Sequence, residues 1–486
     1  MKQDSNPALL LKLFWLGAFC CAALSSHAQS GLPEEVAAAL RAAQINETSL
    51  SALVLPVHGG TPRLAHFEQR AMAPASTLKL LTTLVALEEL GPVFRWQTQL
   101  LTQAAVKGST LRGALYLRGG GDPDLNWDGL RAMFRSLRSQ GVRRLDGDLI
   151  LDRSYFQPTR LDIDAPAFDE SPYAYYNVIP DALLFNGNLI EFELESGERQ
   201  TSVRTRPPLD GFRIDSALSL ADSKCEAWDD DWDPPRTRIK ADGSITLLLR
   251  GAFPRNCKTR TRLNLLDRNL YIERFVRAFW KELGGSWSGK AVDGLTPTDA
   301  RLLVQRSSST LADMVRPINK TSDNAMTRTL YLTLGTQLPT EGRGDNTLRK
   351  ADAAVRIWFA RHGIADDGLV LENGSGLSRL ERISARQLAS VLQVGAGSNW
   401  FAEFASSFPI VAVDSAMRKR LTESAAAGRA RIKTGTLRDA TAVAGYVRDK
   451  NNQDWIVVAI INDTEAMKGR PALDAVINWT ANGQPD

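Results

Sequence analysis

The sequence lacks any concentration of positive charge. Its 486 residues carry 59 Lys and Arg against 55 Asp and Glu, and the basic residues are spread along the chain rather than gathered in a block. Nucleic-acid-binding proteins collect positive charge on one face or segment, so we expect no nucleic-acid partner. Apolar residues make up 43% of the chain, which is enough for the cores of two or three globular domains.

Histidine and cysteine are also scarce, with four of each. Beyond the first 30 residues the histidines are His58, His66 and His362, and none belongs to a zinc-binding or Ser-His-Asp pattern. The glycine-rich segment 119–122 lacks the Lys-Ser/Thr pair of a phosphate-binding loop and predicts a turn. We therefore expect neither a metal nor a cofactor.

Long apolar runs are absent as well. The run at residues 13–24 follows Lys2 and Lys12 and is about half of the ~20 residues that span a membrane. Ser26 and Ala28 place small residues where a signal peptidase cuts, so residues 1–28 are predicted to be a signal peptide cleaved after Ala28. A membrane anchor is the alternative. The favoured prediction is an exported protein without a transmembrane anchor.

Two cysteines remain after this cleavage, because Cys20 and Cys21 lie inside the apolar run. In an exported protein the remaining pair, Cys225 and Cys257, favours one disulfide, which would stabilise the fold by roughly 3 to 4 kcal/mol. Two buried free thiols are the alternative.

Predicted strands lie near both ends of the chain, at residues 50–67 and 429–461, and helices dominate the region 310–362 between them. This order predicts an α/β (α+β) domain, formed by residues 29–96 and 297–486, whose terminal strands share one sheet. Residues 97–296 alternate short strands with polar turns. They predict a mostly β insertion, with two nested subdomains.

The chemistry suggested by the sequence begins with Ser76 and Lys79, at the start of a predicted helix. Residues three apart on a helix share a face, so the amine can reach the hydroxyl. A lysine kept neutral by burial can accept a proton from a serine that attacks a carbonyl. The alternative is a serine that caps its helix and a solvated lysine.

Two further motifs follow in order. Ser322-Asp323-Asn324 opens another predicted helix, although Asp323 could simply cap it, and Lys433-Thr434-Gly435 lies in a terminal strand. With S-x-x-K, these motifs resemble those of penicillin-binding proteins and serine β-lactamases. Segments 115–125, 176–188 and 373–379, and the long insertion after Lys79, are similar to the class C low-molecular-mass penicillin-binding proteins, a D-alanyl-D-alanine carboxypeptidase/endopeptidase family.

The resemblance implies a serine β-lactamase/transpeptidase-like domain with an antiparallel sheet flanked by helices. It also implies that Ser76 attacks the bond between two D-alanines while Lys79 takes its proton. Ser322 would pass a proton to the leaving amine, and Asn324 would hold the substrate amide. Lys433 would help to keep Lys79 neutral and would attract the substrate carboxylate.

The resemblance also assigns substrate contacts. Thr434 and Thr436, on either side of Gly435, would bind the carboxylate, and the backbone N–H of Thr436 would form an oxyanion hole with that of Ser76. Asp152 and Arg379 match positions that in relatives approach the acidic side chain of the peptide stem.

Two departures from the family bear on substrate preference. Relatives often carry a Glu shortly after S-D-N, where this chain reads AMTR at 325–328, and Arg438 stands where relatives carry an uncharged group.

The expected partners are peptidoglycan stem peptides and cross-links, with β-lactam antibiotics as covalent inhibitors, in the periplasm. The sequence leaves open both the preferred bond and a homodimer. A β-lactamase and a non-catalytic peptidoglycan- or penicillin-binding protein are the rival hypotheses. No E-x-x-L-N segment lies between the first two motifs, which argues against a β-lactamase, and the intact Ser76, Lys79 and Lys433 argue against a non-catalytic protein.

Overall fold

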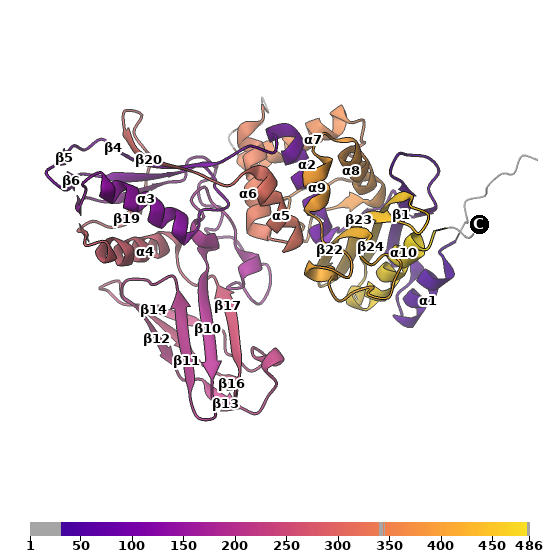
Figure 1. The fold of residues 1–486 in the computed structure, drawn as a ribbon, viewed down its shortest axis with the longest axis horizontal. Coiled ribbons are helices and arrows are strands. Elements are labelled where there is room, and N and C mark those ends of the chain that lie inside the picture. Colours follow the sequence, from indigo (N-terminus) through magenta and orange to yellow (C-terminus); the bar gives the residue numbers. More distant parts are fainter. Residues whose placement is uncertain (1–30, 340–343, 345, 484–486) are drawn as a thin grey trace, which may run out of the picture.

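A computed structural model describes residues 31–339, 344 and 346–483 (Figure 1). The predicted signal peptide, its cleavage after Ala28, and Cys20 and Cys21 lie outside the described residues. No helix among the described residues is both long and apolar enough to cross a lipid bilayer.

Strands from both ends of the chain form one antiparallel sheet, which confirms the predicted fold class. Its strand order is β2-β1-β24-β23-β22. Leu50 pairs with Ile461, so the first strand of the described chain lies beside the last. The strands are β1 (Leu50–Pro56), β2 (Leu64–His66), β22 (Ala430–Leu437), β23 (Ala440–Arg448) and β24 (Asp454–Asn462).

The sheet is covered on both faces, which explains why its central strands are continuously apolar. Alternate residues of β24 pack in opposite directions, Val457 against one helical layer and Val458 against the other. One layer holds α1 (Glu34–Ala42) and α10 (Arg470–Ala481). The other holds α2 (Lys79–Leu90), α5 (Leu311–Lys320), α6 (Asn324–Gln337), α7 (Thr347–Arg361), α8 (Ala385–Gly397) and α9 (Phe401–Ser406).

Helix α2 lies at the centre of this second layer, where every residue from Lys79 to Leu87 is buried. Two short strands pair beside it, β3 (Ala71–Met72) and β21 (Ile383–Ser384). Short 3-10 turns complete the fold at Glu47–Ser49, Ala75–Leu78, Tyr175–Asn177, Phe185–Asn188, Cys225–Ala227, Ser415–Met417 and Ala466–Gly469.

The part of the insertion next to this domain contains two sheets and two helices, α3 (Trp127–Ser139) and α4 (Arg268–Glu282). A five-stranded sheet has the order β19 (Ala291–Asp293), β9 (Leu149–Asp152), β7 (Leu115–Gly119), β4 (Gln97–Thr102), β20 (Arg301–Ser307). A four-stranded sheet has the order β18 (Ser286–Trp287), β8 (Arg144–Asp146), β6 (Thr110–Arg112), β5 (Val106–Lys107). Strand β20 pairs with β4, so residues 301–307 belong to the same sheet as strands of the insertion.

The distal part of the insertion consists of short strands, seen in the lower part of Figure 1. One sheet contains β11 (Thr201–Arg206), β10 (Ile190–Ser196) and β17 (Lys258–Leu263), and another contains β12 (Phe212–Ser216), β15 (Ile245–Leu249) and β14 (Arg236–Ile239). Strands β13 (Ser219–Ala221) and β16 (Ala252–Pro254) form a third pair.

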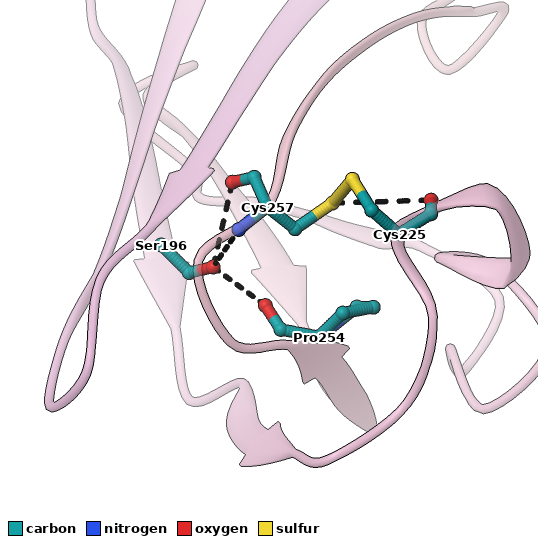
Figure 2. The surroundings of a disulfide bond; sticks show 4 residues. All are labelled: Ser196, Cys225, Pro254 and Cys257. Atoms are coloured by element: carbon teal, nitrogen blue, oxygen red, sulfur yellow. Dashed lines mark hydrogen bonds between the residues drawn. A yellow bond between two sulfur atoms is a disulfide. The ribbon is translucent and has the colours of Figure 1, made fainter.

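The predicted disulfide is confirmed and lies in this distal part (Figure 2), with Cys225 and Cys257 joined at an S–S distance of 2.01 Å. Beside it, the hydroxyl of Ser196 accepts the N–H of Cys257 at 3.0 Å and donates to the carbonyl of Pro254 at 2.5 Å. The bond therefore links the segment before β14 to the start of β17. The alternative of two free thiols is excluded.

Candidate active site

The first part of the candidate site is the turn that leads into α2. Ser76 lies in the 3-10 turn before the helix, and Lys79 is its first α-helical residue. The preceding residue, Ala75, has a φ of 46°, a conformation that non-glycine residues adopt at an energetic cost and that is common at functional sites. Lys79 Nζ lies 3.0 Å from Ser76 Oγ, as the spacing of three residues predicts.

The surroundings of Lys79 suit a neutral amine. Its Nζ also lies 2.6 Å from Asn324 Oδ1 and 2.5 Å from the carbonyl oxygen of Ser375, both of which can only accept. A neutral amine has two N–H groups for these acceptors, and its lone pair then faces the Ser76 hydroxyl. Burial, followed by the nearby charge of Lys433, lowers the pKa of Lys79 well below its ordinary value. In this neutral form, an amine 3.0 Å from the Ser76 hydroxyl can chemically accept its proton.

The second part is the start of α6. Asp323 caps this helix by accepting the N–H of Met326 at 2.8 Å, so its side chain is used structurally. Ser322, with a φ of 61°, precedes the cap and faces the cleft. Asn324 presents its Oδ1 to Lys79 and donates its Nδ2 to the carbonyl of Tyr176 at 3.0 Å, and this second bond fixes the orientation of its amide.

The third part is β22, the edge strand of the main sheet. Lys433 is 1% exposed, and its Nζ donates to Ser322 Oγ at 3.0 Å and to the carbonyl of Thr434 at 2.7 Å. Burial lowers the pKa of Lys433 to about 7. A Cβ added to Gly435 would lie 2.8 Å from Ser76 N, so only glycine lets the strand pass this close to the nucleophile.

These parts border a cleft of about 1010 Å³ between the main domain and the insertion. Of the residues predicted from sequence, the cleft is lined by Ser76, Ser322, Asn324, Thr434, Thr436 and Arg379. Lys79 and Lys433 lie behind this lining and reach Ser76 and Ser322 through the bonds above. The structure thus brings the three motifs together.

Sequence reasoning missed one wall of this cleft, the loop containing Phe168, Asp169 and Glu170. Glu170 forms an ion pair with Arg438 at 2.9 Å, and the carbonyl of Phe168 accepts a bond from Arg379 at 3.1 Å. The guanidinium of Arg379 also lies over the Phe168 ring. The sequence signal was a pair of acidic residues, Asp169 and Glu170, between two prolines. No local pattern predicts that this pair lies near Ser76.

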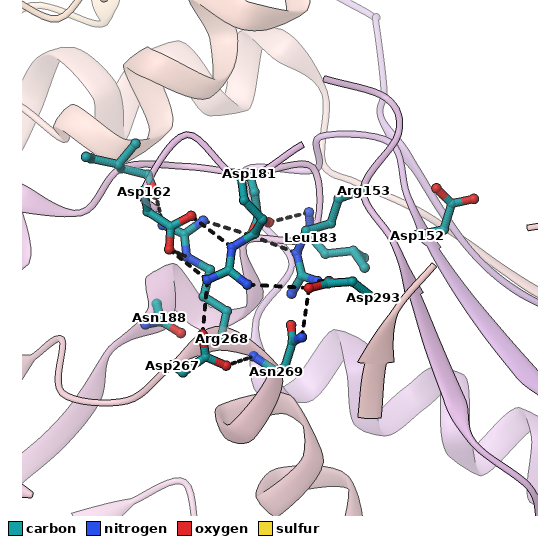
Figure 3. A network of polar contacts seen from close by, with 12 residues as sticks. Asp152, Arg153, Asp162, Asp181, Leu183, Asn188, Asp267, Arg268, Asn269 and Asp293 are labelled. Carbon is teal, nitrogen blue, oxygen red and sulfur yellow. Dashed lines mark hydrogen bonds and ion pairs between the residues drawn. The ribbon is translucent and has the colours of Figure 1, made fainter. Parts of the chain in front are cut away.

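Asp152 does not join the cleft. It ends β9 and is 2% exposed, and its carboxylate accepts the N–H of Ser154 at 3.0 Å and that of Thr296 at 2.8 Å. Figure 3 shows it apart from the neighbouring charged cluster that contains Arg153 and Asp181. Its oxygens are used to hold backbone in the insertion, which explains why an acid at this strand end is buried.

The comparison with protein families identifies the chain. A family model described as the D-Ala-D-Ala carboxypeptidase 3 (S13) family matches residues 32–483. The chain belongs to this family. The family predicted from the ordered motifs is thereby confirmed, and this S13 chain is a serine peptidase, a hydrolase of the D-Ala-D-Ala carboxypeptidase type.

Individual relatives agree with the family. The chain is 27% identical over 470 residues to the D-alanyl-D-alanine carboxypeptidase of Actinomadura sp. (strain R39), which covers 93% of this chain and 85% of that one. It is 25% identical over 399 residues to the D-alanyl-D-alanine carboxypeptidase DacB of Haemophilus influenzae, covering 80% of each. The crystal structure of penicillin binding protein 4 from H. influenzae matches with a TM-score of 0.75 at 20% identity, over 92% of this chain and 99% of that one. This structural likeness shows that the S13 chain shares the penicillin-binding protein fold.

Proposed function

We propose that this chain cleaves D-alanyl-D-alanine bonds of peptidoglycan peptides through an acyl-enzyme on Ser76, with Lys79 as the general base. The observation that supports this most directly is the 3.0 Å contact between Lys79 Nζ, a buried amine with a lowered pKa, and the Ser76 hydroxyl. Arrangements of this kind activate a serine that is otherwise unreactive at neutral pH.

In the proposed first step, Ser76 Oγ bonds to the carbonyl carbon and its proton moves to Lys79 Nζ. The C–N bond then breaks, and the leaving amine receives a proton from Ser322, which takes a proton in turn from Lys433 at 3.0 Å. Water then attacks the ester and gives one proton through Ser322 to Lys433, while Ser76 Oγ takes back the proton held by Lys79 as the C–O bond breaks. This step releases the shortened peptide and restores the Ser76 hydroxyl. The backbone N–H groups of Ser76 and Thr436 are proposed to stabilise the oxyanion.

Protonated Lys433 and the hydroxyls of Thr434 and Thr436 are proposed to bind the terminal carboxylate of the substrate. This is supported by the position of Thr434 and Thr436 in the lining of the cleft and by the contact of Lys433 with Ser322, which also lines it. The proposal covers both carboxypeptidase and endopeptidase activity. Arg379, which lines the cleft, is proposed to contact the peptide stem. The proposal does not include Asp152, whose carboxylate accepts two backbone N–H groups away from the cleft.

The proposal includes β-lactam antibiotics as covalent inhibitors. Penicillin binding protein 4 of H. influenzae has been solved in complex with a β-lactam, and its fold matches this chain. We also propose a periplasmic location, which is supported by the signal-peptide pattern and by the disulfide between Cys225 and Cys257. A homodimer stays a prediction.

Intact-mass analysis with penicillin tests the proposal. We expect one adduct on the wild type and none on Ser76→Ala, while Ser375→Ala, which alters a buried side chain near Lys79, retains the adduct. Release of D-alanine from a pentapeptide would distinguish an enzyme from a non-catalytic binding protein. A wild type without an adduct, or a Ser76→Ala variant with the same adduct, would contradict the proposal. Rapid nitrocefin hydrolysis would instead indicate a β-lactamase.

A further inference from the structure

A buried carboxylate lies behind the loop that contacts Lys79. Glu381 is 1% exposed, and its two oxygens accept four backbone N–H groups. The bonds to Oε1 come from Glu372 at 3.2 Å, Asn373 at 2.9 Å and Gly374 at 2.7 Å, and the bond to Oε2 comes from Gly376 at 2.8 Å. Since all four partners are donors, they satisfy a carboxylate anion and leave no acceptor among them for a carboxylic acid proton.

One peptide unit connects this carboxylate to the proposed base. Its N–H, that of Gly376, donates to Glu381 Oε2, and its carbonyl, that of Ser375, accepts from Lys79 Nζ at 2.5 Å. A negative charge at the N–H end of an amide polarises the group and makes its oxygen a stronger acceptor. Glu381 therefore acts on Lys79 without touching it.

The loop at residues 373–376 packs against the helix that follows the nucleophile. The carbonyl of Gly374 accepts from Thr82 Oγ1 on α2 at 2.6 Å. A Cβ added to Gly376, whose φ is +80°, would lie 1.8 Å from the carbonyl oxygen of Ala75, the residue before Ser76. Residues 373–376 thus lie directly against the start of α2.

We propose that Glu381 is a positioning residue of the reaction, which holds Lys79 Nζ beside Ser76 Oγ through the Ser375–Gly376 peptide unit. The inference rests on the proposed roles of Ser76 and Lys79. The proposal adds Glu381, a buried carboxylate outside the three motifs, to the residues that act on Lys79.

The charges around Lys79 come from several elements. Burial and Lys433 of β22 lower the pKa of Lys79, Asp323 and Glu381 raise it, and Arg328 of α6 lowers it. Glu381 itself faces Arg328 and Tyr331 of α6 in addition to Lys79. Burial raises the pKa of Glu381, and its four N–H donors oppose that rise. Removing the charge of Glu381 therefore lowers the pKa of Lys79 further, and the base stays neutral at lower pH.

Glu381→Gln tests the proposal through the pH dependence of acylation of Ser76 by a fluorescent penicillin. We expect acylation at neutral pH to slow by about tenfold, the cost of losing one charge-assisted hydrogen bond. We also expect the acidic limb of the profile to move about one pH unit lower, because a unit charge several ångströms away has an effect of this size inside a protein.

Asp449→Asn is the matched control. Asp449 is 2% exposed and likewise accepts backbone N–H groups, those of Asn451 and Gln453 at 2.9 Å each, but it lies in the turn after β23. This variant loses a buried carboxylate without altering the site, so its acidic limb should match that of the wild type. A Glu381→Gln profile that also matches the wild type would overturn the proposal.

Glu381→Asp provides a second test, and it replaces the first if Glu381→Gln does not fold. It keeps the charge but is shorter by one carbon–carbon bond, about 1.5 Å. We expect slower acylation with an acidic limb close to that of the wild type, and an unchanged rate contradicts the proposal. A wild type that is not acylated at Ser76 would refute the proposed function, whereas normal wild-type acylation with an unshifted Glu381→Gln profile would refute only the role of Glu381.

Discussion

The substitution Asp181→Asn is expected to lower the stability of the fold strongly, because Asp181 belongs to a buried charged cluster in the insertion. The side chain of Asp181 is fully buried, and it accepts bonds from Arg153 Nε at 2.8 Å, Arg268 Nη1 at 2.7 Å and the N–H of Leu183 at 2.7 Å (Figure 3). Burial acts to raise its pKa, but the two guanidinium groups prevail and the pKa is lowered. Asp181 is therefore an anion that compensates two buried cations.

Removing one partner from a buried ion pair costs about 3–5 kcal/mol, because it leaves a desolvated charge. Arg153 retains Asp293 and Arg268 retains Asp162, so we expect a value near the lower end, about 3 kcal/mol. For a cooperative unit of about 200 residues this corresponds to a fall in Tm of about 6–12 °C.

The same substitution should also slow acylation of Ser76, since the segment before Asp181 contacts the site. The carbonyl of Tyr176 accepts from Asn324 at 3.0 Å, and that of Val178 accepts from Arg328 at 3.3 Å. We expect acylation to slow by several-fold at a temperature where the variant is folded. If Asp181 were only a stability element of the insertion, this rate would not change.

Thermal unfolding of the wild type, Asp181→Asn and the control Asp215→Asn checks the magnitude. Asp215 pairs with Arg250 at 3.2 Å on the surface, where such pairs contribute 0–1 kcal/mol or so. A carboxylate with a lowered pKa stabilises the fold above its ordinary pKa of about 4 and loses this contribution as the pH falls. The difference in Tm between the wild type and Asp181→Asn should therefore be largest at pH 7 and decrease below about pH 4. A Tm of Asp181→Asn no lower than that of Asp215→Asn would refute the reasoning.

Three further outcomes are expected. Gly435→Ala should slow acylation by about a hundredfold, because the added Cβ would lie 2.8 Å from Ser76 N and would push the nucleophile out of position. Thermal unfolding checks that this variant is folded. The pH profile of kcat/KM should be bell-shaped: activity needs Lys79 neutral and so falls on the acidic side, and it needs Lys433 protonated and so falls above about pH 7. Replacing both Cys225 and Cys257 by Ser should lower stability by about 3–4 kcal/mol for a closure of 32 residues, measured by denaturant unfolding, with acylation within about twofold of the wild type.

The sequence predicted most reliably what local geometry determines. The spacing of Ser76 and Lys79 places both on one helix turn, and the structure shows their contact. Strands near both chain ends, with helices between them, predicted a shared sheet, and β1 pairs with β24. That the three motifs meet was available only from their order and their resemblance to a known family, because no local rule brings β22 to α2.

Long-range pairing limited the prediction of the insertion. Residues of β20 (Arg301–Ser307) mix charged and apolar side chains, and they become a strand by pairing with β4, about 200 residues earlier in the chain. The register even shifts between Leu302 and Val304, so simple alternation does not describe it. The end of the insertion at residue 296 stays a prediction, because it rests on local composition, which does not detect a pairing partner so far away.

Acidic residues posed the hardest problem, because a carboxylate can serve either a ligand or the backbone. Asp152 was a candidate for substrate contact, yet its oxygens accept backbone N–H groups, and Glu381, which the motifs did not indicate, accepts four of them. Local sequence does not distinguish a carboxylate that binds a ligand from one that accepts backbone N–H groups. The outcome depends on whether a turn, or a segment far away in the sequence, points its N–H groups at the carboxylate. Two of the acids that line the cleft, Asp169 and Glu170, come from a loop preceding the Asp181 cluster. Substrate preference in this chain should therefore respond to substitutions in the insertion as well as to those in the three motifs.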